Sequence, residues 1–344
     1  MSQINILNFN QERNFDLSKI SPLKIQKIAK TVYIPKDVKE CEKLIRYLIS
    51  QKKNYYILGN ISNSIICPDD KDKITIPIIL TKNLNQFSVD TKNKKAVAEC
   101  GVLLSKFSRN ISNECFDGFS GLMGFPATIG GAIFMNAGSY GQEISDFLES
   151  VDCINNKGEL VNLKKEELKF KWRISNFQNI YKNYFILKAY FNLVAYDKEK
   201  ILLHQNFCKN HRIIFQEKGG TNLGSTFATK WIYSDIQSKK ISFIVIRKFF
   251  NIFFKITLFL RMYFIIPFLT KHFIQYCLNY FNFKIPKGIN ISNKSLNCIV
   301  VEYSNTNLEE YVNFIKQYKK LLNPKSELEI QILNEKENWN NNLS

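Results

Sequence analysis

Histidine is scarce in this chain, and the cysteines lack the spacing that binds metal. The three histidines form no ligand pattern, and none of the eight cysteines stands in a C-x-x-C pair. A structural zinc site or a disulfide framework requires such groups in paired patterns. The sequence therefore predicts neither. No basic segment followed by an apolar run opens the chain, so no secretory signal is expected and a cytoplasmic location is predicted.

Acidic residues are in deficit. Lys and Arg number 48 against 30 Asp and Glu, which gives a formal net charge of +18. A basic surplus is compatible with nucleic acid, an anionic membrane surface or a polyanionic substrate. The lysines are spread along the whole chain, and the sequence carries no helix-turn-helix or RNA-binding signature. We therefore expect no nucleic-acid partner.

Long uncharged hydrophobic runs are absent as well. Residues 241–283 are strongly apolar and aromatic, yet their longest charge-free stretch is 262–270, which Pro267 interrupts. A transmembrane helix needs about 20 predominantly apolar residues, so a membrane span is not expected. The segment instead predicts two helices, over about 241–266 and 269–280, bent at Pro267.

Two interpretations of this apolar piece remain open. We expect residues 232–284 to be an insertion whose aromatic side chains pack onto the C-terminal domain, because an apolar patch is more often buried than exposed. The alternative is contact with a membrane surface through 241–283, since Lys248, Asn251 and Lys255 fall on one helical face.

The length of 344 residues suggests two or three domains. Residues 31–35 and 55–59 are expected to be strands on either side of a helix over 38–50, a β-α-β unit with a glycine at the exit of its second strand. Further extended segments are predicted over 73–80, 95–104 and 184–196, with a hairpin over 147–163.

The C-terminal part has its own pattern. Thr306 and Glu309 predict a capping box at the start of a helix. One face of this helix is expected to be an apolar stripe made of Leu308, Tyr311, Val312, Ile315, Tyr318 and Leu322. Pro324 is expected to stop this helix, and residues 327–333 are expected to form a final strand.

One stretch has unusually few large side chains. Residues 124–146 read GFPATIGGAIFMNAGSYGQEISD and include five glycines and three alanines. Glycine removes side chains where something must lie against the main chain, and exposed N–H groups in such turns can cradle a pyrophosphate. The alternative is a turn of small residues packed against a neighbouring helix. The glycine pattern alone does not decide between them.

This stretch resembles the flavin-binding segment of the UDP-N-acetylenolpyruvoylglucosamine reductase (MurB) family. The matching positions are Gly124, Pro126, Gly130, Gly131, Ala132, Met135, Asn136, Ala137, Gly138, Tyr140, Gly141, Glu143, Ile144 and Asp146. Other segments resemble the family in the same order along the chain: LGNISN (58–63), EELKFKWRISNFQ (166–178), NLGSTF (222–227), ISNKSLNCIVV (291–301) and SELEIQIL (326–333). The resemblance covers nearly the whole chain except the apolar piece.

The resemblance implies a reaction and its partners. The family reduces the enolpyruvyl ether of UDP-N-acetylglucosamine to the lactyl ether, which gives UDP-N-acetylmuramate for peptidoglycan. NADPH is the co-substrate, and noncovalent FAD passes the hydride to the vinyl carbon. The neighbouring carbon gains enolate character and must then take up a proton.

Three side chains are implied to be catalytic. Arg173 matches the family arginine that holds the substrate carboxylate, a task suited to the paired donors of a guanidinium. Ser225 matches the proton donor, and Glu329 matches the acid that stabilises the enolate if it is kept protonated. Each residue taken alone would be read as an ordinary surface or loop residue, and their joint family spacing is what favours catalysis.

The resemblance also implies a fold and a cofactor site. The fold class is α+β, with an FAD-binding fold of two α+β subdomains of the vanillyl-alcohol-oxidase type, over 20–90 and 91–200, and a C-terminal α+β substrate domain over 201–335. The implied cofactor-binding residues are Leu58, Gly59, Asn60, Ser62, Asn63, Gly124, Pro126, Thr128, Gly130, Gly131, Asn136, Gly138 and Tyr140.

The chain departs from the family pattern at several positions. Ile61 replaces the second glycine of the flavin turn, and Gln26 and Lys27 replace a glycine pair. A β-branched residue resists the positive φ that glycine adopts freely. Two alternatives therefore remain: a relative that binds FAD or a nucleotide sugar without this reaction, and a flavin oxidase acting on another sugar.

Overall fold

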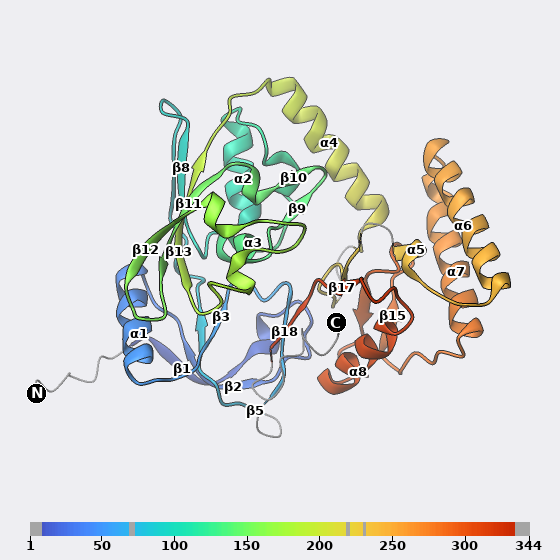
Figure 1. The fold of residues 1–344 in the computed structure, drawn as a ribbon, viewed down its shortest axis with the longest axis horizontal. Coiled ribbons are helices and arrows are strands. Elements are labelled where there is room, and N and C mark those ends of the chain that lie inside the picture. The colour runs from blue at the N-terminus through green and yellow to red at the C-terminus, as the bar shows by residue number, and fades with distance from the viewer. Residues whose placement is uncertain (1–8, 69–72, 218–220, 230–231, 334–344) are drawn as a thin grey trace, which may run out of the picture. The chain divides into compact units, whose positions relative to one another are not determined.

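The computed structural model describes residues 9–68, 73–217, 221–229 and 232–333 (Figure 1). The chain divides into two compact units. The first comprises residues 1–16, 28–61 and 70–209, and the second comprises residues 17–27, 62–69 and 210–344. The three-part division expected from the sequence stays a prediction, and its boundary at residue 335 lies outside the described residues.

The first unit contains two sheets. One has the order β1-β2-β6-β3, with β5 also paired to β2. Its strands are β1 (Gln11–Asp16), β2 (Ile28–Tyr33), β3 (Tyr56–Leu58), β5 (Lys73–Ile74) and β6 (Ile78–Leu80). Strands β2 and β3 both pair in parallel with β6, so the helix α1 (Val38–Ser50) crosses between parallel strands as the β-α-β pattern predicts.

The second sheet is antiparallel, with the order β12-β11-β13-β8-β7. Its strands are β7 (Phe87–Asp90), β8 (Lys95–Glu99), β11 (Leu148–Ile154), β12 (Leu160–Lys164) and β13 (Phe185–Asn192). Helices α2 (Leu104–Asn113) and α3 (Ile129–Phe134) lie beside this sheet (Figure 1) and share a hydrophobic core with it. The expected hairpin over 147–163 is confirmed, with Gly158 at a positive φ of 82° in its turn.

Shorter elements complete the first unit. The small hairpin β9 (Gly138–Ser139) and β10 (Gln142–Glu143) follows α3. The 3-10 turns are η2 (Ser120–Leu122), η3 (Ile144–Asp146), η4 (Lys165–Leu168) and η5 (Asn176–Gln178). Helix α4 (Lys198–Phe215) begins in the first unit and ends in the second.

The second unit is built from short strands and helices. Strand pairs are β14 (Phe227–Ala228) with β17 (Glu327–Leu328), β15 (Ile289–Ile291) with β16 (Ile299–Val301), and β18 (Gln331–Leu333) with β4 (Ser64–Ile66). Its helices are α5 (Ile232–Asp235), α6 (Ile241–Phe259), α7 (Ile266–Tyr280) and α8 (Leu308–Lys319), with the 3-10 turns η1 (Leu17–Lys19) and η6 (Tyr263–Ile265). One hydrophobic core joins these elements.

The expected amphipathic face of α8 is confirmed. Every residue of the predicted stripe is buried: Leu308, Tyr311, Val312, Ile315, Tyr318 and Leu322. The capping box is shifted by one residue, because Asn307 and not Thr306 is the N-cap. Its side chain accepts a 2.9 Å hydrogen bond from the Glu310 N–H, and Glu310 accepts in return from the Asn307 N–H.

Several other expected boundaries are wrong. The extended segment over 95–104 ends at Glu99, the one over 184–196 ends at Asn192, and the one over 73–80 is interrupted between β5 and β6. The final strand over 327–333 is broken at Glu329 and Ile330, where the Glu329 N–H donates to the Thr226 carbonyl oxygen at 2.9 Å. The two halves pair with different strands, β17 antiparallel with β14 and β18 parallel with β4, so the chain changes partner between them.

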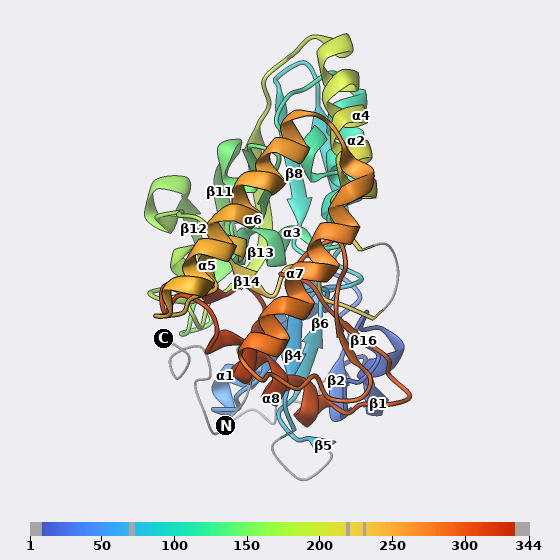
Figure 2. The same cartoon turned by 90° about the vertical axis from the view of Figure 1, so that its right-hand side faces the viewer.

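The apolar piece forms a helical hairpin that is best seen in Figure 2. The break lies at residues 260–262 and not at Pro267, which instead occupies the first turn of α7, where its missing N–H costs nothing. Phe243 and Phe254 of α6 and Phe273 of α7 are buried in the core of the second unit, as the packing interpretation predicts. In the described part of the chain, no helix has both the length and the hydropathy that a membrane span needs.

Candidate active site

Two of the turns predicted to bind the cofactor lie against each other in the first unit. Strand β3 ends at Leu58, and the turn that follows meets the loop 124–128. The Asn60 side-chain amide donates a 2.7 Å hydrogen bond to the Pro126 carbonyl oxygen. A Cβ at Gly59 would lie 2.2 Å from Thr128 Oγ1, so only glycine permits this approach. The structure thus brings Gly59, Asn60, Pro126 and Thr128 together.

The turn after β3 keeps a left-handed residue although the family glycine is lost. Ile61 has a φ of +51°. This conformation costs a β-branched residue on the order of 1–2 kcal/mol. The side chain of Ile61 is only 3% exposed, and its burial offsets that cost. Ile61 therefore adopts the left-handed conformation that glycine would adopt freely.

This turn also leaves backbone donors unused. Among the described residues, the N–H groups of Gly59, Asn60 and Ile61 find no hydrogen-bond acceptor. Consecutive N–H groups in a turn after a strand are the arrangement that binds a phosphate oxygen.

The glycines of α3 do not offer their N–H groups to a ligand. The Gly130 N–H donates to the Cys100 carbonyl oxygen at 2.8 Å, and the Gly131 N–H donates to Thr128 Oγ1 at 3.3 Å. A Cβ at Gly130 would lie 3.0 Å from the Cys100 Cβ. The anion cradle expected at these two residues is therefore replaced by close packing and N-capping. Their assignment as cofactor contacts stays a prediction.

The hairpin turn in the glycine-rich stretch 124–146 explains Gly138 and Gly141 locally. Tyr140 and Gly141, with φ of 54° and 78°, form the two-residue turn between β9 and β10, and two positive φ values are what such a tight hairpin requires. A Cβ at Gly138 would lie 2.7 Å from the Glu143 Cγ across this hairpin. The Tyr140 ring contacts the Phe207 ring edge-on at 6.0 Å.

Asn136 connects the glycine-rich stretch 124–146 to the predicted catalytic arginine. It is fully buried, and its Nδ2 donates to Glu143 Oε2 at 2.7 Å and to the Lys171 carbonyl oxygen at 3.0 Å. Its Oδ1 is buried without a hydrogen-bond partner in the described part of the chain. Two acceptors around Nδ2 define which way the amide points. The free oxygen is therefore an unused acceptor beside the turn that carries Arg173.

Arg173 occupies a constrained turn. Lys171 and Ile174 pair across it, and Arg173 has a φ of +59°. Gln178 Nε2 donates to its carbonyl oxygen at 3.0 Å, and its guanidinium lies 4.8 Å from the Trp172 ring centre. A non-glycine residue held in this region costs on the order of 1–3 kcal/mol and persists only where neighbours determine it. The side chain is thus presented from a rigid base.

Ser225 is exposed at the start of β14 in the second unit. It follows Gly224, which has a φ of +74°, and bridges to Cys298. The next residues are clamped by Asn297, whose backbone oxygen accepts from the Thr226 N–H at 2.8 Å. Asn297 was not singled out as a site residue from the sequence, although it lies in the matched segment 291–301.

Glu329 is half-buried between β17 and β18. Asn63, predicted to contact the cofactor, donates through Nδ2 to the Glu329 carbonyl oxygen at 2.8 Å. The Asn63 carbonyl oxygen in turn accepts from the Gln331 N–H at 2.8 Å. Because β14 pairs with β17 in antiparallel and the Glu329 N–H bonds Thr226, the structure brings Ser225 and Glu329 to the same end of this strand pair. Ser62 also belongs to this unit, whereas Arg173 belongs to the first.

Gln26 fills the position where the family has a glycine. It is 5% exposed, its Nε2 donates to the Ser64 carbonyl oxygen at 2.9 Å, and its Oε1 accepts from the Ile66 N–H at 3.2 Å. The glutamine thus completes the hydrogen bonding of β4. This departure from the family pattern serves local structure.

This chain is similar in sequence to proteins of known name. A profile of FAD binding domains matches residues 29–164. A UDP-N-acetylenolpyruvoylglucosamine reductase of Borrelia garinii subsp. bavariensis is 36% identical over 213 residues, which cover 60% of this chain and 67% of that protein. The chain belongs to the UDP-N-acetylenolpyruvoylglucosamine reductase family.

Other members of the reductase family match over a similar part. The Borreliella burgdorferi reductase is 36% identical over 58% of this chain and 64% of its own length, and the Listeria monocytogenes (strain EGD-e) reductase is 37% identical over 55% and 61%. The match thus spans slightly less than two thirds of these relatives. The crystal structure of MurB from Thermus caldophilus superimposes with a TM-score of 0.65 at 20% identity, over 95% of this chain and 99% of that one, which establishes the shared fold.

The residues of the first unit fit the FAD that the reductase family uses. The N–H groups of Gly59, Asn60 and Ile61, which have no acceptor in the part of the chain that the structure describes, provide donors for a phosphate, and the buried Oδ1 of Asn136 provides an acceptor. Cys100 and Cys153 are buried, and burial raises the pKa of both thiols. A neutral, buried thiol is a poor nucleophile, so these two cysteines do not suit a covalent flavin link.

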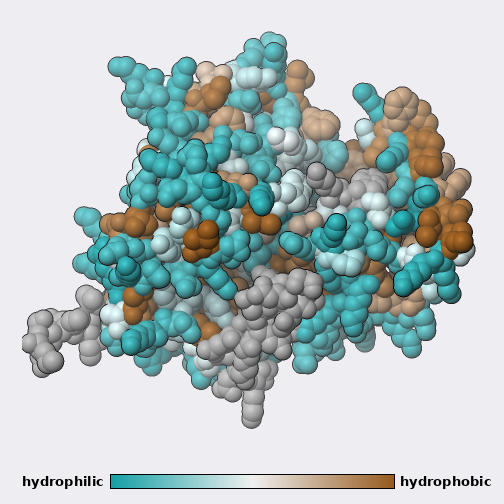
Figure 3. Space-filling view, in the orientation of Figure 1, coloured by the Kyte–Doolittle hydropathy of each residue, from teal (hydrophilic) through white to brown (hydrophobic). Residues whose placement is uncertain are grey.

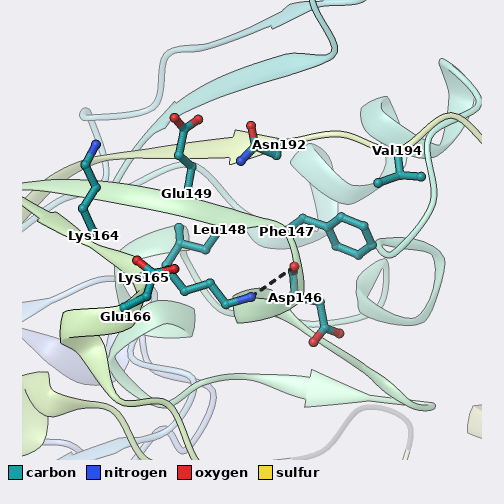
Figure 4. A pocket seen from close by; sticks show the side chains of 9 residues that line it. All are labelled: Asp146, Phe147, Leu148, Glu149, Lys164, Lys165, Glu166, Asn192 and Val194. Atoms are coloured by element: carbon teal, nitrogen blue, oxygen red, sulfur yellow. Dashed lines mark hydrogen bonds between the residues drawn. The ribbon is translucent and has the colours of Figure 1, made fainter.

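A separate cavity of about 520 Å³ lies beside β11 and β12 (Figure 4). Its lining residues are Asp146, Phe147, Leu148, Glu149, Lys164, Lys165, Glu166, Asn192 and Val194. Lysines and carboxylates offset each other there, and Lys165 Nζ donates to the Asp146 carbonyl oxygen at 3.3 Å. It contains none of the predicted site residues, so it is not the candidate active site.

Proposed function

We propose that this chain reduces UDP-N-acetylglucosamine enolpyruvate to UDP-N-acetylmuramate, with NADPH as the source of the hydride. Bound FAD supplies the hydride transfer to the vinyl carbon of the substrate. The family membership and the presence of all three implied catalytic residues support this activity. A cytoplasmic location belongs to the same proposal and agrees with eight cysteines of which none stands in a C-x-x-C pair.

Arg173 has the role of holding the substrate carboxylate. Hydride addition to the vinyl carbon pushes electron pairs toward the carboxylate and gives it enolate character. A guanidinium with paired donors stabilises that charge, and its constrained backbone limits the reorganisation needed during the reaction.

Ser225 has the role of delivering the proton. The carbon next to the carboxylate must gain one proton after the vinyl carbon gains the hydride, so the two additions together saturate the double bond. The hydroxyl of Ser225 is exposed and therefore accessible to a substrate.

Glu329 has the role of a second acid. Its backbone is tied to Thr226 on one side and to Asn63 on the other, which fixes its position relative to Ser225. If its carboxyl group is protonated in the complex, it donates to the developing enolate.

The observation that carries the proposal is the 36% identity to a named reductase over 213 residues. The test incubates the FAD-loaded protein with NADPH and the enolpyruvate and analyses the product by mass spectrometry. We expect a product two hydrogens heavier than the substrate, with one NADPH consumed per product. NADPH consumption that ignores the substrate, with no mass change, would contradict the proposal.

A further inference from the structure

The outer face of α6 is apolar along its whole length. Residues at helical spacing on this face are Ile241, Val245, Phe249, Ile252, Ile256 and Phe259. Their exposed fractions run from 46% for Ile256 to 86% for Phe259. Figure 3 shows hydrophobic side chains gathered at this edge, over α6 and α7. Large exposed apolar surfaces of this kind mark interaction sites.

This face is distinct from the one that holds α6 in place. Phe243 and Phe254 point into the core of the second unit, where Phe254 contacts Tyr233 at 5.0 Å between ring centres. Arg247 also faces the protein, because its Nη1 donates to the carbonyl oxygens of Ser234 and Ile236. The helix is therefore packed on one side and carries an unused apolar stripe on the other. Packing onto the C-terminal unit accounts for only part of the apolar segment.

The charges that border the stripe are all positive. Lys248 and Lys255 are exposed and precede Ile252 and Phe259 by one helical turn. The sequence contains no Asp or Glu between Asp235 and Glu302, while lysines and arginines recur throughout that stretch. Long lysine side chains beside an apolar stripe can extend to anionic headgroups while the stripe enters the acyl boundary.

We propose that the outer face of α6 docks onto the surface of an anionic lipid bilayer. At 1.5 Å per residue, a helix of 19 residues lies about 28 Å along the membrane plane. A second copy of the chain fits this face less well, because a two-fold contact would bring the cationic border close to its own copy with no acidic residue in the segment to neutralise it.

The experiment is co-sedimentation of the FAD-loaded protein with vesicles. One set contains phosphatidylcholine alone, and the other contains phosphatidylcholine with phosphatidylglycerol. We expect binding to the anionic set, little binding to the neutral set, and release at about 0.5 M salt, where exposed charges are screened. Replacing Lys248 and Lys255 by alanine should weaken binding roughly fivefold for each lysine.

The apolar half of the proposal is tested by Phe249→Ser combined with Ile252→Ser. Each of these two substitutions removes an exposed apolar side chain, so the fold should persist. The flavin spectrum and the melting temperature should therefore stay unchanged. Membrane binding should fall at least about tenfold. The matched control is Leu203→Ser with Ile180→Ser, two side chains that are 70% and 71% exposed elsewhere. The control should bind vesicles as the unmodified protein does.

Three results would overturn the proposal. The first is no co-sedimentation with either set of vesicles. The second is equal loss of binding in the control pair. The third is a dimer in sedimentation velocity that the Phe249 and Ile252 substitutions convert to a monomer, which would assign the face to a second copy of this chain.

Discussion

The side-chain amide of Asn297 holds both backbone polar groups of Phe227. Its Oδ1 accepts from the Phe227 N–H at 2.8 Å, and its Nδ2 donates to the Phe227 carbonyl oxygen at 2.7 Å. Asn297 is 8% exposed, so no solvent replaces these bonds when one is lost. The residue thereby positions the segment that begins with Ser225.

Asn297→Asp should keep a side-chain oxygen that accepts from the Phe227 N–H and remove the Nδ2 group that donates to the Phe227 carbonyl oxygen. We expect a loss of stability of about 0.5–1.5 kcal/mol, because the Phe227 carbonyl oxygen keeps only the hydrogen bond that the Thr229 N–H donates. Substrate reduction should slow while transfer from NADPH to the flavin is unchanged. Chemical denaturation and single-turnover kinetics measure the two effects. Asn290→Asp, an exposed asparagine in β15, is the control, and an equal effect there would remove the positioning role from Asn297.

Ser225→Ala should affect the second half-reaction alone. Losing a positioned general acid costs typically 10²–10⁴-fold in rate. Stopped-flow absorbance separates the reduction of the flavin by NADPH from its reoxidation by the substrate. Only the reoxidation should slow. Equal slowing of both half-reactions would point to a folding defect. The control is Ser242→Ala on the exposed part of α6, which measures the effect of losing a serine hydroxyl elsewhere.

Alanine variants are usually more stable than glycine variants, and at Ile61 we expect the opposite order of stability. Both Ile61→Ala and Ile61→Gly lose the buried side chain, but only glycine relaxes the φ of +51°. We expect the glycine variant to be the more stable of the two by about 1 kcal/mol, and both to be less stable than the native chain. Thermal unfolding of the pair decides this, and an alanine variant as stable as the glycine variant would show that the turn is unstrained.

The flavin should be released by acid precipitation. No histidine precedes residue 204, and Cys100 and Cys153 are buried thiols whose pKa is raised by burial. No histidine is therefore available in residues 1–203, and neither of these two thiols is a reactive nucleophile. The supernatant is expected to hold the yellow colour. Colour retained in the protein pellet would indicate a covalent bond and favour a flavin oxidase.

Local sequence patterns predicted the elements whose apolar side chains pack together on one face. Helix α1 spans the predicted residues 38–50 because Cys41, Leu44, Ile45 and Leu48 are all buried at helical spacing. The resemblance also supplied the types and order of the proposed catalytic residues, since Arg173, Ser225 and Glu329 lie in separate matching segments, and their roles stay predictions.

Long-range pairing is what the sequence did not reveal. The strand predicted over 327–333 breaks because its two halves pair with different partners, β17 with β14 and β18 with β4, which lie far apart in the chain. The Gly130 N–H is used by Cys100 and not by a ligand, for the same reason. Competition between neighbours matters too: Asn307 takes the cap that Thr306 was expected to form, and both residue types cap helices well.

The most direct test of the reductase activity is the visible spectrum of the purified, FAD-loaded protein under anaerobic conditions. NADPH should bleach the flavin absorption, and UDP-N-acetylglucosamine enolpyruvate added afterwards should restore it within a single turnover. A flavin that bleaches with NADPH but does not recover with the substrate, or a protein that takes up no FAD, would contradict the assignment.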